Sequence, residues 1–213
     1  MRDRSQLLEK AFRYFRSRRL RLFERTFNIS EGTRILDVGG SPEIWSFSRR
    51  RPQLTILNMP SALSPHRQHA NLVGADGRML PFSDGAFDIV FSNSVIEHVG
   101  TRDDQRLFAR EVARVGRNYW IQTPNRRFPF EHHVMLPAIH FLPKRWQGAV
   151  VSRFTGWEHV VHPTADERRN YLHHFLHELN LLDASDMKAL FPESTVVKER
   201  FLGFPKSLIA VRR

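Results

Sequence analysis

The chain has 213 residues, 41% of them hydrophobic, which is enough apolar surface to bury a core in one α/β domain. It contains no Cys, which excludes disulfides, Cys-ligated zinc sites and Cys nucleophiles. Its 33 Lys and Arg outnumber its 22 Asp and Glu, for a formal net charge of +11. Such a surface attracts phosphates, acidic sugars, nucleic acid or anionic lipid, but a general preference for arginine gives the same excess, so charge alone names no partner.

Residues 5–25 place apolar side chains at helical spacing between arginines, which predicts a helical cap over residues 1–30. The same pattern suits a helix that lies on a membrane surface, and that alternative stays open. No signal-peptide core is visible and no uncharged stretch is long enough to span a bilayer. We therefore expect a cytoplasmic protein.

Short apolar segments then alternate with helical ones. The first five expected strands cover residues 33–38, 54–58, 71–74, 87–92 and 119–123. A helix capped by Thr101 and ended by Gly116 separates the last two of these. Further helices near 164–179 and 185–190 precede a closing strand pair at 195–199 and 207–211. This order predicts a Rossmann-like, doubly wound sheet of seven strands with an antiparallel last strand.

Residues 124–164 break this alternation. They are rich in Pro, His and aromatic residues and are too long for a simple connection. Because the fifth strand ends at the sheet edge where ligands bind, the segment must leave from the rim of the site. We expect an inserted lid on the substrate side, within a single domain that covers residues 1–213.

Glycine and polar residues follow the expected strands at that same edge. Asp37 ends the first strand and precedes a Gly39-Gly40 turn, and Asn58 ends the second strand. Three longer runs follow along the chain, namely Gly74-Ala75-Asp76-Gly77, Leu80-Pro81-Phe82-Ser83-Asp84-Gly85-Ala86-Phe87-Asp88-Ile89-Val90 and Ser92-Asn93-Ser94-Val95-Ile96-Glu97-His98-Val99.

This succession of motifs, from about Arg34 to Asn125, resembles the class I S-adenosylmethionine (SAM)-dependent methyltransferases. The resemblance is strongest to the subgroup of small-molecule and quinone methyltransferases. It implies SAM as the cofactor and a set of residues that contact its amino-acid end, ribose, adenine and methyl group. The implied cofactor-binding residues are Asp37, Gly39, Gly40, Ser41, Asn58, Asp76, Gly77, Ser92, Asn93 and Ser94.

The chain departs from the family pattern at three positions. Ser41 and Glu43 stand where the turn usually has glycines, and Asn58 stands where an acidic residue usually binds the ribose. These departures keep open a non-catalytic SAM-binding protein of the same fold. The basic charge motivates a second alternative, an RNA methyltransferase, but no N/D-P-P-Y-type motif follows the fourth strand, so nucleic acid is not the expected partner.

Histidine supplies the candidate catalytic groups. His98 follows the fourth strand, near the expected methyl group, and His132 and His133 lie in the insertion, so each could act as a general base. His173 and His177 share a helix face, but no carboxylate completes a known metal-ligand spacing, so no metal is expected. The expected function is methyl transfer to a small-molecule, lipid-like or glycan-like acceptor. The acceptor would be anionic if the excess of basic residues serves to attract it. The methylated atom and the oligomeric state stay open.

Overall fold

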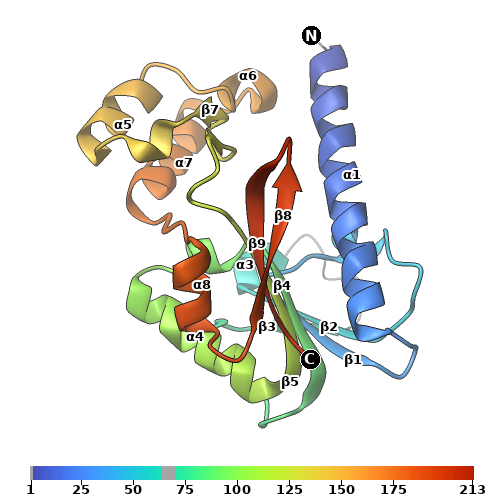
Figure 1. Cartoon of the computed structure of the whole chain (residues 1–213). Helices are drawn as coiled ribbons and strands as arrows, with labels where there is room; N and C mark the ends of the chain where they lie inside the picture. Colours follow the sequence, from blue (N-terminus) through green and yellow to red (C-terminus); the bar gives the residue numbers. More distant parts are fainter. Residues whose placement is uncertain (1, 64–70) are drawn as a thin grey trace.

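A computed structural model describes residues 2–63 and 71–213, with side chains from residue 13 onward. Seven strands form one sheet in the order β3-β2-β1-β4-β5-β9-β8 (Figure 1). The strands are β1 (Arg34–Val38), β2 (Gln53–Asn58), β3 (Leu72–Gly74), β4 (Phe87–Asn93), β5 (Gly116–Pro124), β8 (Thr195–Phe201) and β9 (Phe204–Arg212). β9 runs antiparallel to both β5 and β8, whereas the pairs from β3 to β5 are parallel. The predicted fold class is therefore confirmed.

The direction of chain winding changes between β1 and β4. From β1 the chain continues outward to β2 and β3, and it then returns so that β4 pairs with the other side of β1. In open α/β sheets, such a switch leaves a crevice beyond the carboxyl ends of the two central strands. The crevice between β1 and β4 is thus the expected ligand position.

Helices cover both faces of the sheet. Phe23 of α1 (Arg2–Phe27) and Trp45 of α2 (Pro42–Trp45) pack on one face against Phe91 of β4. Phe108 of α4 (Arg102–Val115) and Phe191, which follows α8 (Ala184–Leu190), belong to the core on the other face. Within the described residues, no helix combines the length and apolarity needed to cross a membrane.

Local hydrogen bonds set the helix boundaries. Thr101, the predicted cap of α4, forms a capping box with Asp104, and Thr164 and Glu167 form another at the start of α7 (Ala165–His177). α2 ends at Trp45. The Ser46 hydroxyl donates to the carbonyl of Glu43, which competes with helix continuation.

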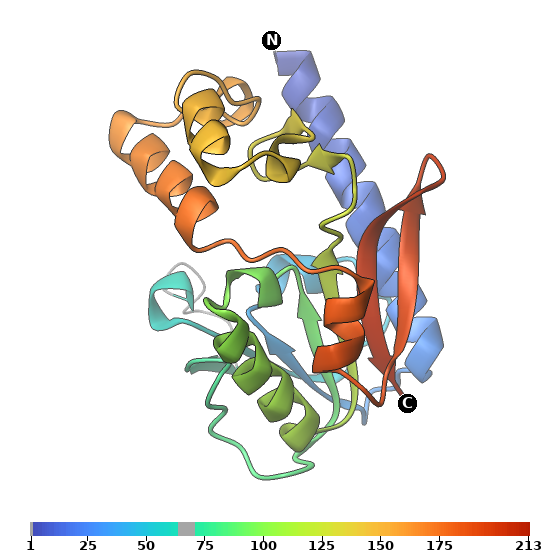
Figure 2. The ribbon, with the colours of Figure 1, turned by 60° about the vertical axis from the view of Figure 1, so that its left-hand side comes forward.

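The insertion forms a separate small layer above the sheet edge (Figure 2). It holds β6 (Phe130–Glu131), β7 (Leu136–Pro137), η3 (Ile139–Phe141), α5 (Lys144–Val151) and α6 (Glu158–Val161). Its own core joins Val134 and Val151 to Leu172 and Phe175 of α7. α7 therefore packs on the core of the insertion, and the substrate-side role of residues 124–164 stays a prediction.

Candidate cofactor and acceptor site

The turn after β1 requires glycine at two positions. Gly39 has φ +75°, and a Cβ there would lie 2.5 Å from the Val95 side chain. A Cβ at Gly40 would lie 1.9 Å from Oδ2 of Asp37. Both contacts are shorter than real side chains allow, so the turn exposes bare backbone at the β1–β4 crevice.

Asp37 supports this turn from below. Its carboxylate is buried, and Trp45 Nε1 donates to Oδ2 at 2.7 Å. The other oxygen, Oδ1, has no hydrogen-bond partner among the described residues. Burial raises the pKa of Asp37 to about 7, and the Trp45 hydrogen bond opposes that rise only in part. The Asp37 carboxylate is therefore buried beneath the turn and tied to α2 rather than exposed.

Asn58, at the end of β2, is also tied to the turn. Its Nδ2 donates to the carbonyl oxygen of Gly40 at 3.0 Å, and its Oδ1 accepts from the backbone N–H of Met59 at 2.8 Å. Ser41 precedes α2 as its N-cap residue, without a side-chain capping bond, and Glu43 is exposed in the first turn of that helix. The three departures from the family pattern thus leave the turn intact.

The residues after β3 form the next part of the crevice. Arg78 Nε and Nη2 donate to the Asp76 carboxylate at 2.6–3.0 Å, and Arg78 Nη1 donates to Asp104 at 2.7 Å. The Arg78 hydrogen bonds lower the pKa of Asp76. A Cβ at Gly77 would lie 3.0 Å from the Phe108 ring, so that backbone is tightly packed. Asp76 is therefore ionised, and the hydrogen bonds from Arg78 already occupy part of the accepting capacity of its carboxylate.

The three residues at the end of β4 take different places. Ser92 is fully buried, and its hydroxyl donates to the carbonyl of Val38 at 2.8 Å, so it joins β4 to β1 beneath the crevice. Asn93 and Ser94 both line a cavity on the β5 side of β4. Ser94 has φ +57° and donates to Gln122 Oε1 at 3.0 Å. At Ser94 the chain therefore changes direction, away from the crevice and toward that cavity.

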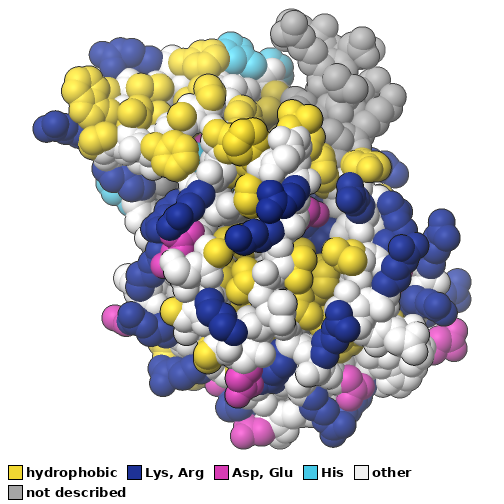
Figure 3. Space-filling model, in the orientation of Figure 1, with side chains coloured by type: hydrophobic (Ala, Val, Ile, Leu, Met, Phe, Trp, Pro, Cys, Tyr) yellow, Lys and Arg dark blue, Asp and Glu magenta, His cyan; other side chains and the backbone are white. Residues whose placement is uncertain are grey.

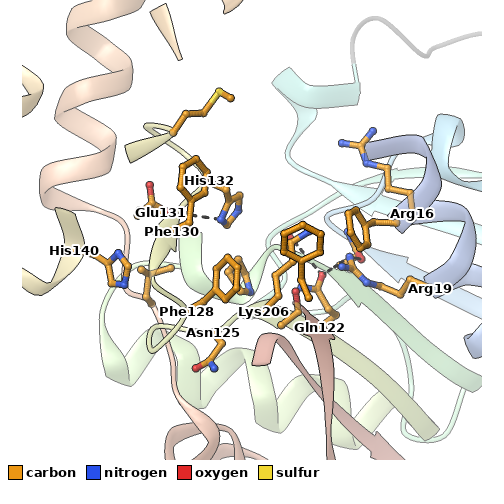
Figure 4. A pocket seen from close by; sticks show the side chains of 18 residues that line it. Arg16, Arg19, Gln122, Asn125, Phe128, Phe130, Glu131, His132, His140 and Lys206 are labelled. Atoms are coloured by element: carbon orange, nitrogen blue, oxygen red, sulfur yellow. Dashed lines mark hydrogen bonds and ion pairs between the residues drawn. The ribbon is translucent and has the colours of Figure 1, made fainter. Parts of the chain in front are cut away.

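This cavity has a volume of about 660 Å³, within the usual range for small-molecule pockets. It lies between α1, the end of β5, the insertion and the β8–β9 hairpin (Figure 4). Apolar side chains form much of its wall, namely Phe15, Pro124, Phe128, Phe130, Met135, Leu181 and Phe201. Its polar lining comprises Arg16, Arg19, Asn93, Ser94, Gln122, Asn125, Glu131, His132, His140, Lys206 and Ser207.

Cations dominate the charge of the cavity wall. The Arg19 side chain is buried, and its Nη1 donates to Gln122 at 2.9 Å while Nη2 pairs with Glu199 at 2.7 Å (Figure 4). Lys206 Nζ lies 3.8 Å from the centroid of the Phe15 ring, and burial lowers the pKa of this lysine. Sequence reasoning missed Arg19 and Lys206 because no motif marks them.

The three candidate catalytic histidines come together beside the cavity. The ring centroids of His98 and His133 are 5.1 Å apart, and those of His132 and His133 are 4.1 Å apart. His98 Nδ1 lies 2.8 Å from Nε2 of His174, a residue that the sequence did not single out. Burial, reinforced by neighbouring imidazoles, lowers the pKa of His98 to about 3 and that of His132 to about 4. Both rings are therefore neutral near pH 7.

Two buried carboxylates accompany these histidines. Glu97 is fully buried and accepts from the Thr123 hydroxyl at 3.0 Å, and burial raises its pKa to about 7. Burial acts on Glu131 in the same direction, but its 2.6 Å hydrogen bond with His133 and the nearby imidazoles lower its pKa overall. The Glu131-His132-His133 run was the one sequence signal for this grouping.

Known proteins resemble the chain in sequence and in fold. Residues 52–118 match a family model described as a methyltransferase domain. An uncharacterized methyltransferase of Mycobacterium sp. (strain KMS) is 38% identical over 93 residues, which are 40% of this chain and 35% of that relative. The chain thus matches about a third of the length of this curated relative.

Two solved structures share the fold. One belongs to the complex between the Haloferax volcanii Trm112 methyltransferase activator and the putative methyltransferase, with a TM-score of 0.55, 14% identity and coverage of 98% of this chain and 91% of that one. The other is magnesium protoporphyrin IX methyltransferase from Synechocystis PCC 6803 with bound SAH, with a TM-score of 0.52, 9% identity and coverage of 92% and 82%. At these identities the likeness concerns the fold.

The sequence matches and the sheet topology agree with each other and with the expected superfamily. The narrower subgroup of small-molecule and quinone methyltransferases stays a prediction. Residues 52–118 match a methyltransferase domain, and the fold of the chain is that of the class I SAM-dependent methyltransferases.

Proposed function

We propose that the chain binds SAM in the β1–β4 crevice and directs its methyl group to a small-molecule acceptor in the adjoining cavity. The observation that carries this proposal is the Gly39-Gly40 turn, where bare backbone lies above the buried carboxylate of Asp37. The domain match and the SAH bound by the Synechocystis relative support the same cofactor. SAM would supply a methyl group already activated on a sulfonium.

The crevice residues fit the parts of this cofactor. Backbone groups of Gly39, Gly40 and Ser41 would face its amino-acid end, and the second lone pair of Asn58 Oδ1 would accept from the ribose. Asp76 and the Gly77 backbone would contact the adenine. Asn93 and Ser94 end β4 and line the cavity, so the methyl group would pass between them and Gln122.

The chain itself mainly orients the acceptor and excludes water, since an activated methyl group needs in-line placement more than further activation. Where the acceptor must lose a proton, His98 and His132 are candidate bases, because both imidazoles are neutral near pH 7; their lowered pKa values make them weak bases unless binding of the acceptor raises those values. His133 lies in ring contact with both and completes the set of candidate bases.

The cavity favours an acceptor with an apolar body and an anionic group. Aromatic side chains such as Phe128 and Phe130 would pack against the body, and Arg19, Arg16 and Lys206 would attract the anion. A lipid-like acid and an acidic aromatic compound both meet this description. The cavity lies between α1 and the insertion and has the size of a small-molecule pocket, which favours such a compound over the RNA alternative.

A surface on the insertion supports the lipid-like acceptor. Phe141, Trp146 and Phe154 are each about half exposed, at 55%, 56% and 49%, and Arg145 and Arg153 lie beside them in the chain. Yellow hydrophobic side chains gather over this region at the upper left of Figure 3, with Lys and Arg nearby. We call Phe141, Trp146 and Phe154 the insertion patch and propose that it contacts anionic membranes, together with the basic N-terminal helix.

Calorimetric titration with S-adenosylhomocysteine (SAH) tests the cofactor proposal. We expect saturable binding of one SAH per chain, and a loss of more than about tenfold in affinity for Gly40→Ala, because the new methyl group displaces Asp37. Gly32→Ala is the matched control, since nothing lies within 4 Å of its added Cβ. If folded Gly40→Ala binds SAH like the wild type, the site is misplaced. SAH binding without methyl transfer to any acceptor would favour the non-catalytic alternative.

A further inference from the structure

A cluster of histidine and glutamate side chains lies where η2 (Ile96–His98) faces the insertion. Glu97 and His98 come from η2, and His133 comes from the insertion. Their potential ligand atoms all lie within 4.8 Å of one another. We propose that Glu97, His98 and His133 bind a divalent first-row transition metal ion such as Zn²⁺. No metal was expected from the sequence, because the ligands come from segments far apart in the chain.

An unsatisfied carboxylate oxygen points to this cation. Glu97 is 0% exposed, and its Oε2 accepts from Thr123. Its Oε1 has no hydrogen-bond partner in the described part of the chain and lies 4.0 Å from Nε2 of His98. A buried oxygen without a partner is costly, and a bound cation would remove that cost.

A chain of hydrogen bonds orients the ring of His98. His98 Nδ1 lies 2.8 Å from His174 Nε2, and His174 Nδ1 lies 2.7 Å from a Glu178 oxygen. Because the Glu178 carboxylate only accepts, a neutral His174 donates to it through Nδ1 and accepts at Nε2. His98 then donates through Nδ1, and the lone pair on its Nε2 faces Glu97.

Glu131 orients His133 in the same way. The 2.6 Å contact between His133 Nδ1 and Glu131 Oε1 leaves Nε2 as the free nitrogen of that ring. Histidines that bind metals usually donate their other ring N–H to an acceptor of this kind. A second triad, Glu131, His132 and His133, also lies within ligand distance, but its Glu131–His133 bond already joins two of its members.

Two imidazoles and one carboxylate favour zinc and its first-row neighbours over Mg²⁺ or Ca²⁺, which prefer oxygen ligands. Bonds of about 2.1 Å place neighbouring ligand atoms about 3–3.5 Å apart, so the side chains must close by an ångström or so. Because the ligands come from η2 and from the insertion, the ion would tie the insertion to the sheet.

The position of the cluster refines the proposed function, on which this consequence rests. With the ion bound, His98 and His133 act as ligands, and His132 remains the candidate base. Glu131 and His132, which adjoin the cluster, also line the acceptor cavity. An ion held by three protein ligands keeps open coordination positions. A hydroxyl or carboxylate of the acceptor would take one of them, which makes an oxygen-bearing compound the expected substrate class.

Calorimetric titration of the full chain with Zn²⁺ tests the site. We expect one ion per chain and a rise in the melting temperature, since the ion binds only the folded form. Glu97→Gln keeps the shape and the acceptor for Thr123, and it should lower Zn²⁺ affinity by about a hundredfold or more. The matched control is the double variant His173→Gln/His177→Gln, which removes an exposed histidine pair on α7 and should change affinity by less than about twofold.

Absence of stoichiometric Zn²⁺ binding by the folded wild type would overturn the proposal, as would loss of binding in the α7 control alone. Should Glu97→Gln fail to fold, Co²⁺ absorption provides the second measurement. Bands of a nitrogen-ligated ion are expected in the wild type and should vanish in His133→Gln, and their persistence would contradict the assignment. SAH titration with a chelator present separates the two proposals, because SAH binding without metal leaves the cofactor site standing.

Discussion

The side-chain amide of Asn58 donates to the carbonyl oxygen of Gly40 at 3.0 Å, so the residue that ends β2 holds the turn that follows β1. The same side chain accepts from the N–H of Met59. Asn58 therefore acts as a structural link between two strands as well as a candidate ribose contact. An acidic residue, which is usual in the superfamily, could not donate to Gly40.

From the sequence alone, Asn58→Asp would be expected to retain or strengthen SAM binding, because a charged acceptor makes the stronger hydrogen bond. The structure reverses this expectation, since the new carboxylate would face the Gly40 carbonyl. We expect Asn58→Asp to lower SAH affinity by about tenfold or more, and Asn58→Ala by less. Calorimetry on the folded variants measures both effects. Tighter binding by Asn58→Asp would show that the turn rearranges to accept the charge.

The buried carboxylate of Asp37 should make stability depend on pH. Its pKa is raised from 3.8 to about 7 in the folded chain, so its protonated form favours folding. The protonated side chain contributes its full stabilisation below about pH 4. As the pH rises from 4 to 7 this stabilisation is lost, which lowers the free energy of unfolding by roughly 4 kcal/mol. Asp37→Asn keeps an acceptor for Trp45 and does not titrate. Its free energy of unfolding relative to the wild type should therefore rise between pH 4 and pH 8.

Urea denaturation at several pH values, without cofactor, measures this difference. Asp84→Asn serves as a control, because the Asp84 side chain is 81% exposed. A difference between Asp37→Asn and the wild type that stays constant with pH would mean that Asp37 is ionised without penalty in the folded protein.

The sheet was predictable from the sequence because its signals are local. Apolar strands, the Thr101 and Thr164 caps and the glycine turn each involve neighbouring residues. The acceptor cavity was not predictable in the same way. Arg19, Gln122 and Lys206 meet there only after α1 and the β8–β9 hairpin have packed beside β5.

The same reason applies to the insertion and to the end of β4. α7 has an ordinary helical pattern, and only its contacts reveal that it packs on the core of the insertion. Ser92 stays a predicted cofactor contact, and no local pattern indicates that its hydroxyl donates to the carbonyl of Val38. Alternation along a strand does not indicate which polar residue faces a ligand when both faces of the sheet are covered.

Lys206 should contribute to binding of an anion in the cavity. Anilinonaphthalene sulfonate, which joins an apolar body to an anionic group, is a suitable probe. Lys206→Met should weaken its binding by about tenfold, because a charged hydrogen-bond donor is lost from a partly buried site. The exposed Lys198→Met is the matched control. Equal affinities measured by fluorescence titration for both variants would place the anion elsewhere, and SAH affinity should be unchanged in each.

The insertion patch should bring the protein to anionic vesicles. We expect co-sedimentation with phosphatidylglycerol vesicles and much less with phosphatidylcholine, since basic residues accompany the apolar side chains. Phe141→Ser with Trp146→Ser should reduce binding by about tenfold or more, because two large side chains lose their apolar contact. Met79→Ser removes another exposed apolar side chain, 77% exposed, as the control. Equal losses in both variants would contradict a specific patch.

A crystal structure of the chain with SAH would test the proposed cofactor site, because it locates the cofactor. We predict SAH against the Gly39-Gly40 turn, with its ribose near Asn58 and its sulfur facing Ser94 and the acceptor cavity. SAH in another place, such as the second cavity lined by Arg106, Arg110 and Tyr119, would contradict it. An empty crevice in crystals grown with saturating SAH would do the same.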